Sequence, residues 1–145
     1  MIHYRTLSFD DLASIVAIEN QSFQEPWSHD GFSLIMSNPS FASMGLFMDD
    51  KLAGYIFYYL VLDELHVMNV AVDPIFRNQK LATKLLTKVH DFGKEKSIKY
   101  AYLEVRETNE AAQKLYACLG YQKQGRRIGY YSNQEDALLM YKELL

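Results

Sequence analysis

A carboxylate and a phenol in neighbouring predicted elements are the side chains best suited to move protons. Glu104 lies in a predicted strand, and Tyr116 lies in the helix predicted to follow it. Side chains alternate along a strand, so Glu104 shares a face with Tyr100 and Tyr102. Asn109 and Tyr116 are two helical turns apart and share a face of their helix. If both faces line one cleft, the carboxylate can accept a proton and the phenol can donate one.

Ordinary structural roles would also account for both residues. A solvated charge on an exposed strand face would account for Glu104. Packing beside Leu115 and Leu119 would account for Tyr116. Spacing alone therefore leaves the catalytic and the structural interpretations open.

A junction of strand, loop and helix is the second segment that could do chemistry. The strand that contains Asn69 to Val72 is followed by a loop, and a helix opens near Leu81. A helix begins with unpaired backbone N–H groups and a partial positive charge, which suit a phosphate or pyrophosphate. Many such junctions bind nothing, so the pattern by itself only indicates a possible anion site.

Composition places these residues in a globular protein and disfavours several classes. The chain has 145 residues, 49% hydrophobic and 23% charged, so we expect one domain over residues 1–145. A formal charge of −3 does not favour a nucleic-acid binder, and the single cysteine rules out an internal disulfide. We find no apolar leader and no run long enough to cross a bilayer. We expect a soluble, cytoplasmic protein without membrane partners.

Hydrophobic periodicity and turn residues predict strands and helices in alternation. The expected strands are 2–7, 41–48, 52–62, 64–72, 98–105, 121–131 and 137–144. The expected helices are one after Ser8, one after Ser28 that ends before Pro39, one from Gln79 to Phe92, and one from Asn109 to Gly120. The order βααβββαβαββ fits an α/β or α+β sandwich.

The two chemical segments, in this order, resemble the GNAT superfamily of N-acetyltransferases. NVAVDP with RNQKLA resembles its coenzyme A pyrophosphate motif, and NEAAQKLYACLGY resembles the following helix. More narrowly, the chain resembles the RimI branch, bacterial alanine N-acetyltransferases that act on a small-subunit ribosomal protein. The supporting residues are Pro26-Trp27-Ser28, Leu62-Asp63-Glu64, Leu103-Glu104-Val105-Arg106, Arg126-Arg127, Tyr130-Tyr131 and Glu135-Asp136-Ala137. The resemblance covers almost the whole chain and implies a GNAT fold, a mixed, mostly antiparallel sheet of about seven strands flanked by about four helices.

The resemblance also implies a role for each residue of the two segments. The acetyl carbonyl and pantetheine of acetyl-CoA would lie against the backbone of Val70, Ala71 and Val72. The pyrophosphate would lie against the loop amides of Arg77, Asn78, Gln79, Lys80, Leu81 and Ala82. Asn109 would hydrogen-bond the pantetheine region. Glu104 would be the general base, directly or through a water, and Tyr116 the general acid.

The residue types suit that chemistry. A free α-amine has a pKa of about 7.7–8.0, so at neutral pH it must lose a proton before it attacks. A partly buried carboxylate can accept this proton, and a tyrosine with a pKa of about 10 can donate one to the leaving thiolate. Backbone N–H groups would polarise the thioester carbonyl. No covalent enzyme intermediate is needed, so we expect Cys118 to be a core residue without a chemical role.

Lys80 departs from the family pattern, which has glycine at that place in the loop. Glycine permits close approach of a phosphate and unusual backbone angles. A lysine could compensate by pairing with phosphate, or it could strain the loop and weaken binding. A Lys80→Gly variant would distinguish a working ligand from a handicap.

The acceptor side has weaker signals. Family acceptors begin with alanine followed by a basic residue, whose charge could be met by Asp63, Glu64 and Glu107. Solvated surface carboxylates would explain all three equally well. Tyr130 and Tyr131 could wall a peptide groove, or pack within a strand. The four histidines lack metal-ligand spacing, so we expect no metal.

Two alternatives remain for the function, and the assembly is expected to be simple. A GNAT enzyme could acetylate a small amine, such as a polyamine, an amino acid or an antibiotic, because a fold does not determine the acceptor. A non-catalytic GNAT-fold interaction module would be consistent with Lys80 but not with Glu104, Asn109 and Tyr116 together. The expected binding partners are acetyl-CoA and the N-terminal peptide of a ribosomal protein. We expect the protein to be a monomer or a weak homodimer.

Overall fold

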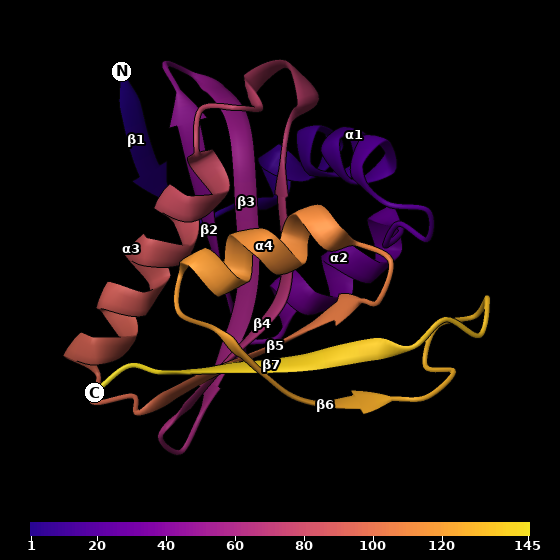
Figure 1. Ribbon diagram of the computed structural model, residues 1–145. Helices are drawn as coiled ribbons and strands as arrows, with labels where there is room; N and C mark the ends of the chain where they lie inside the picture. The colour runs from indigo at the N-terminus through magenta and orange to yellow at the C-terminus, as the bar shows by residue number, and fades with distance from the viewer. The chain divides into compact units, whose positions relative to one another are not determined.

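The computed structural model describes residues 1–145, and its elements follow the predicted order (Figure 1). The strands are β1 (Ile2–Arg5), β2 (Phe41–Met48), β3 (Lys51–Val61), β4 (Glu64–Val72), β5 (Tyr100–Arg106), β6 (Gln122–Arg127) and β7 (Ala137–Glu143). The helices are α1 (Leu12–Ser22), α2 (His29–Ser37), α3 (Leu81–Glu95) and α4 (Glu110–Cys118), with short 3-10 helices at Phe9–Asp11 and Pro74–Phe76. The order βααβββαβαββ and the mixed α/β class are confirmed. None of these helices is long and apolar enough to span a bilayer.

The strands form one mixed sheet of seven strands in the order β1-β2-β3-β4-β5-β7-β6. β1 with β2, β2 with β3, β5 with β7 and β6 with β7 pair antiparallel. β4 and β5 pair in parallel, with Glu64 opposite Tyr100 and His66 opposite Tyr102. This mixed, mostly antiparallel sheet is the one that the GNAT resemblance implies.

Residue contacts divide the chain into two compact units, which are described separately. Unit 1 comprises Met1–Tyr59 and Asn69–Val89, and unit 2 comprises Leu60–Met68 and His90–Leu145. Strand β4 and helix α3 each contribute residues to both units.

Aromatic side chains fill much of the core of unit 1. Phe32 of α2 is fully buried and packs against Trp27, Tyr55 and Phe57, with ring centroids 5.2, 6.1 and 5.3 Å away. Ser28 caps α2 by accepting a hydrogen bond from Gly31 N–H at 3.0 Å, as predicted. The apolar stripe of α3, Leu81, Leu85, Leu86 and Val89, is buried, as its three- and four-residue spacing predicts.

Unit 2 is built on the alternating strand β5. Ala101, Leu103 and Val105 are buried, whereas the intervening side chains, including Glu104, are half-buried. On α4, Tyr116 is buried and packs edge-to-face on Tyr121, with ring centroids 5.9 Å apart. Gly120 has a φ of 96°, the left-handed conformation predicted for the end of this helix.

Three sequence-based expectations were wrong in detail. The third helix begins at Leu81, not Gln79, because Asn78 and Lys80 have left-handed backbone, and it continues to Glu95. The strand expected over 121–131 ends at Arg127, where a turn with left-handed Gly129 begins. Cys118 is exposed, not in the core, because it lies two positions after the inward-facing Tyr116 and so on the other side of α4.

Candidate active site

In unit 1, the end of β4 leads into the loop that the sequence assigns to pyrophosphate. β4 and β3 approach closely here: Asp73 N–H donates to Ala53 C=O at 2.7 Å, and a Cβ on Gly54 would lie 2.9 Å from Ala71 O. A glycine is therefore required opposite Ala71, which is buried. The strand end that includes Val70, Ala71 and Val72 is held in place by this close pairing.

The loop itself is exposed and presents backbone amides. Arg77, Asn78, Gln79 and Lys80 are exposed, and Lys80 C=O accepts the N–H of Lys84 at 3.1 Å as the first bond of α3. The N–H groups that follow Lys80, including those of Leu81 and Ala82, lie in the first turn of a helix and have no intrahelical acceptor. Together with the left-handed backbone, these amides form the kind of turn that binds anions. The donor set fits a pyrophosphate.

Arg77 and Lys80 differ in what they do in this loop. The Arg77 guanidinium lies against the preceding strand and helix, 3.4 Å from Val72 O and 3.3 Å from Ser22 Oγ. Lys80 has a φ of 59°, a left-handed conformation that costs a non-glycine residue roughly 1–2 kcal/mol. Of the two alternatives for Lys80, the backbone strain is present in the structure.

In unit 2, Glu104 lies on the half-buried face of β5 and is paired with a cation. Its Oε1 lies 3.2 Å from Arg127 Nε on β6, and the two side chains are 31% and 56% exposed. Ion pairs this accessible contribute only about 0–1 kcal/mol, so an incoming ammonium group can replace the arginine. Glu104 is thus an accessible carboxylate that already interacts with one positive charge.

Tyr116 is 7% exposed and remains a proton donor over the physiological range. Burial raises its pKa to about 12, with a smaller contribution from Tyr131. Burial is the largest cause of the raised pKa of Tyr131. The positive charge of Arg106 lowers this pKa, and the negative charge of Glu104 raises it. Tyr131 therefore interacts electrostatically with both proposed acid–base groups, and the structural and catalytic interpretations of Tyr116 are compatible.

Asn109 caps α4, a role that its sequence position predicts. Its Oδ1 accepts a hydrogen bond from Ala112 N–H at 3.1 Å. Gln113, one turn further on, donates to the carbonyls of Arg106 and Glu107 at 3.1 and 2.8 Å. The turn between β5 and α4 is thus tied at both ends. The convergence of this turn with the loop of unit 1 on one cleft stays a prediction.

Of the three carboxylates proposed to bind the acceptor peptide, Glu64 and Glu107 each have a side-chain partner, and Asp63 is exposed. Glu64 Oε1 lies 2.8 Å from His66 Nε2, and Glu107 Oε2 lies 3.3 Å from Arg126 Nη1. Asp63 is exposed, and its backbone carbonyl accepts the N–H groups of Lys99 and Tyr100. Their proposed role in reading a basic acceptor residue stays a prediction.

Tyr130 and Tyr131 lie beyond β6, in the loop of residues 128–136, so strand packing does not explain them. Their rings are in edge-to-face contact, with centroids 5.2 Å apart. Tyr130 is 53% exposed, whereas Tyr131 is half-buried. No group of three or more His, Cys, Asp or Glu side chains is arranged to hold a metal ion.

A buried carboxylate in unit 1 was not predicted from the sequence. Glu19 on α1 is 1% exposed and accepts hydrogen bonds from Tyr55 Oη at 2.6 Å, Asn69 Nδ2 at 2.8 Å and Trp27 N–H at 2.9 Å. Glu19 thereby holds Asn69 at the start of the strand end described above. Its position two turns after Leu12, on the apolar face of α1, is the signal that could have revealed it.

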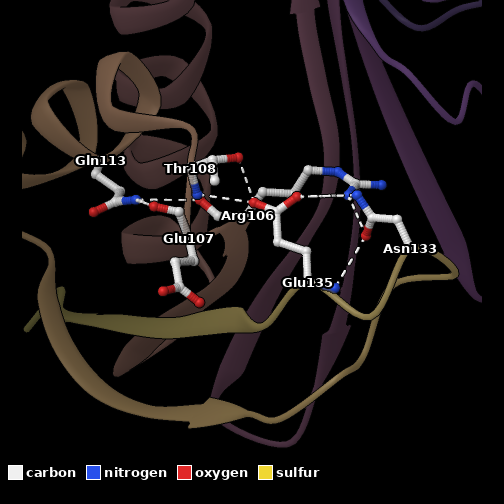
Figure 2. Close-up of polar contacts among 6 residues, drawn as sticks. All are labelled: Arg106, Glu107, Thr108, Gln113, Asn133 and Glu135. Atoms are coloured by element: carbon white, nitrogen blue, oxygen red, sulfur yellow. Dashed lines mark hydrogen bonds and ion pairs between the residues drawn. The ribbon is translucent and has the colours of Figure 1, made fainter.

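The contacts of Glu135 were also not predicted from the sequence. Figure 2 shows this carboxylate between Arg106 and Thr108, with Asn133 beside it. Arg106 Nη1 lies 3.0 Å from Glu135 Oε1, and Thr108 N–H donates to Oε2 at 2.9 Å. Arg106 and Glu135 were part of the family resemblance, but a sequence pattern alone does not pair residues so far apart in the chain.

Known proteins are similar to this chain over most of its length. A family model described as the acetyltransferase (GNAT) family matches residues 12–121. A Bacillus subtilis protein provisionally named ribosomal protein bS18 alanine N-acetyltransferase is 36% identical over 139 residues, which cover 94% of this chain and 92% of the relative. The ribosomal protein bS18 alanine N-acetyltransferase of Salmonella typhimurium is 34% identical over 137 residues, which cover 92% of each chain.

A solved structure shows the same similarity in three dimensions. The crystal structure of the ribosomal-protein-S18-alanine N-acetyltransferase from Escherichia coli matches with a TM-score of 0.91 at 31% identity. The match covers 99% of this chain and 94% of that one. Sequence and structure therefore point to the same relatives.

Proposed function

Because this chain belongs to the GNAT acetyltransferase family, we propose that it acetylates the N-terminal alanine of ribosomal protein bS18, with acetyl-CoA as the donor. That the chain is an N-acetyltransferase follows from its family and its named relatives. The observation that supports the acceptor is the end-to-end similarity, above 30% identity, to enzymes named for this substrate.

The residues of unit 1 are assigned to the donor. The exposed loop amides and the first turn of α3 suit a pyrophosphate in number and in charge. Lys80 adds a cation at this place. The strand end from Val70 to Val72, fixed by the close approach of Gly54, would hold the pantetheine arm and polarise the acetyl carbonyl. When bound, acetyl-CoA supplies an activated thioester.

The residues of unit 2 are assigned to proton transfer. Glu104 accepts a proton from the α-ammonium of the acceptor, directly or through a water, and the free amine attacks the acetyl carbonyl. The C–S bond breaks as the new amide forms, and Tyr116 donates its proton to the departing sulfur. The resulting phenolate then takes up the proton that the nitrogen releases as it becomes an amide, which restores Tyr116. Because the pKa of Tyr116 is raised to about 12, its hydroxyl is protonated when the thiolate leaves. No residue becomes acetylated.

A panel of acceptors tests the acceptor assignment. The purified protein should acetylate a peptide that begins Ala-Arg, detected by mass spectrometry, and should leave the same peptide untouched when its N-terminus is blocked. A polyamine or an amino acid that reacts with a higher kcat/KM than the peptide would contradict the peptide assignment. Ribosomal proteins from cells with and without the gene should differ at the N-terminus of bS18.

Two variants test the residue assignment. Glu104→Gln and Tyr116→Phe should each lower kcat by roughly 10²–10⁴-fold, the usual contribution of general acid–base catalysis. Calorimetric affinity for acetyl-CoA should stay close to that of the unaltered protein. Replacement of the equally charged Glu143 at the end of β7 by Gln is the matched control. A kcat within threefold of normal for Glu104→Gln would remove the base assignment.

A further inference from the structure

The loop between β6 and β7, residues 128–136, is held by polar contacts more than by apolar packing. Ile128 and Tyr130 are 84% and 53% exposed, and every residue of β6 is exposed. Gly129 and Gln134 have φ angles of 61° and 69°, which mark two sharp changes of direction. The conformation of the loop therefore depends on its hydrogen bonds, which converge on Glu135 and Asp136.

Glu135 connects this loop to the turn between β5 and α4 (Figure 2). One carboxylate oxygen accepts from Arg106 at 3.0 Å, and the other accepts from the N–H of Thr108 at 2.9 Å and from its hydroxyl. Gln113 secures the same turn from the side of α4. A single carboxylate thus joins β5, the turn before α4 and the loop.

Arg106 extends this connection to an aromatic ring. Its guanidinium carbon lies 3.9 Å from the centroid of the Tyr131 ring, a cation–π arrangement. The backbone makes a second connection, since Tyr131 N–H donates to Glu135 C=O at 3.2 Å. Glu135 therefore holds Tyr131 by two routes, through Arg106 and through the loop backbone.

Asp136 makes a separate set of contacts and provides an internal comparison. It accepts from Gly129 N–H at 2.9 Å and from Arg126 at 2.8 Å, so it shapes the start of the loop next to β6. Neither contact involves Tyr131. The two neighbouring carboxylates thus shape the loop, and of the two only Glu135 is connected to Tyr131.

We infer that Glu135 is a positioning residue for the acceptor side of the reaction. Its carboxylate, through Arg106 and Thr108, holds the Tyr131 ring over Arg106, on the face of β5 that also carries Glu104. Tyr131 interacts electrostatically with Glu104 and Tyr116. The inference rests on the proposed function, because Tyr131 can influence the reaction only if those two residues carry it. Glu135 itself acts through its neighbours and is assigned no contact with the reacting atoms.

The test is the variant Glu135→Gln, which keeps the size of the side chain and removes its charge. We expect the KM for the Ala-Arg peptide to rise about tenfold, because small displacements of positioning groups have large kinetic effects. The KM for acetyl-CoA should change less than twofold, because Glu135 bonds Thr108 and not Asn109, the one proposed donor residue in this turn, and Asn109 keeps its own bond to Ala112. Glu143→Gln, at the exposed end of β7, is the matched control and should match the unaltered protein in both constants.

A second variant separates positioning from simple stabilisation. Arg106→Lys keeps the charge but loses the planar group that stacks on Tyr131. If Glu135 acts through Arg106, the two substitutions should be non-additive in acceptor KM. Amide hydrogen exchange at Thr108 and Tyr131 should speed up in Glu135→Gln. Equal rises in both KM values, in step with a fall in Tm, would show a merely structural role and overturn the inference.

The same experiment distinguishes the inference from the proposed function. If the unaltered protein acetylates the peptide and Glu135→Gln keeps a normal acceptor KM, the inference is wrong and the function stands. If the unaltered protein does not acetylate the peptide at all, both are overturned. A selective rise in acceptor KM supports both.

Discussion

Two glutamates, one in each unit, gather hydrogen-bond donors in opposite settings. Glu19 in unit 1 is 1% exposed, and its donors are a tyrosine hydroxyl, an asparagine amide and a backbone N–H. Glu135 in unit 2 has 12% of its side chain exposed and takes a charged arginine among its donors. Each joins segments that are distant in the sequence, but only Glu19 is sealed inside a core.

The setting determines what each carboxylate contributes. A buried carboxylate loses its hydration and must be fully hydrogen-bonded, so its contacts and the surrounding core form together or not at all. A carboxylate near the surface can exchange protein donors for water at small cost, so its main effect is on position. The same side chain therefore supports stability in unit 1 and loop geometry in unit 2.

The largest effect should come from Glu19→Ala. The substitution leaves the buried hydroxyl of Tyr55 and the half-buried amide of Asn69 and N–H of Trp27 without their acceptor. An unsatisfied buried group costs about 1–3 kcal/mol. We expect the free energy of unfolding to fall by roughly 3–5 kcal/mol in a urea titration. Glu143→Ala is the exposed control. A loss below about 1 kcal/mol would erase the difference between the two glutamates.

Tyr55→Phe should have the next largest effect. It removes the donor that lies 2.6 Å from Glu19 and leaves the carboxylate with two partners. Burial and the charge of Glu19 both raise the pKa of Tyr55, so this hydroxyl is a permanent donor. We expect a loss of about 1–3 kcal/mol on chemical denaturation. Combined with Glu19→Ala, the losses should not add, and additive losses would mean that the two residues act separately.

Lys80→Gly should have a smaller effect of the opposite sign. Glycine adopts the left-handed angle at position 80 freely, but it also gains entropy in the unfolded chain. We therefore expect a net gain of up to about 1 kcal/mol in unfolding free energy. Lys80→Ala removes the charge and keeps the strain, so the pair of variants separates the two contributions. If Lys80→Gly and Lys80→Ala bind acetyl-CoA with equal affinity, the charge of Lys80, and not its backbone strain, affects acetyl-CoA binding.

The smallest effect concerns pH and Glu135. Hydrogen bonds from Thr108, and then from Arg106, lower the pKa of Glu135 from its ordinary 4.5 to about 2. Because the folded pKa lies below the unfolded one, the contribution to stability is complete above 4.5 and is lost as pH falls toward 2. The Tm difference between the unaltered protein and Glu135→Gln should shrink over this interval. A constant difference would mean that the charge of Glu135 contributes nothing.

Much of the fold was predictable because periodicity reports burial directly. The bounds of β4 and the caps Ser28 and Asn109 agree with the structure. Strain at Lys80 was one of the two alternatives that the sequence left open, since glycine positions indicate a backbone requirement. These features depend on residues close together in the chain, which a sequence pattern can describe.

The contacts made across the fold were not predictable in the same way. Arg106 and Glu135 meet because β5 pairs with β7 and the loop folds back, which no local pattern encodes. The Arg127 partner of Glu104 depends likewise on strand order. Cys118 was misplaced because a cysteine is more often buried than exposed, and that general preference outweighed the helical phase set by Tyr116.

The exposed position of Cys118 makes this chain suitable for site-specific labelling. It is the only cysteine, so a maleimide fluorophore can attach at one place without mutagenesis. The dye would sit on the outer side of α4, turned away from Tyr116, and would leave the buried phenol undisturbed. Its emission could then report on acceptor peptides as they bind, in real time and with no radioactive donor.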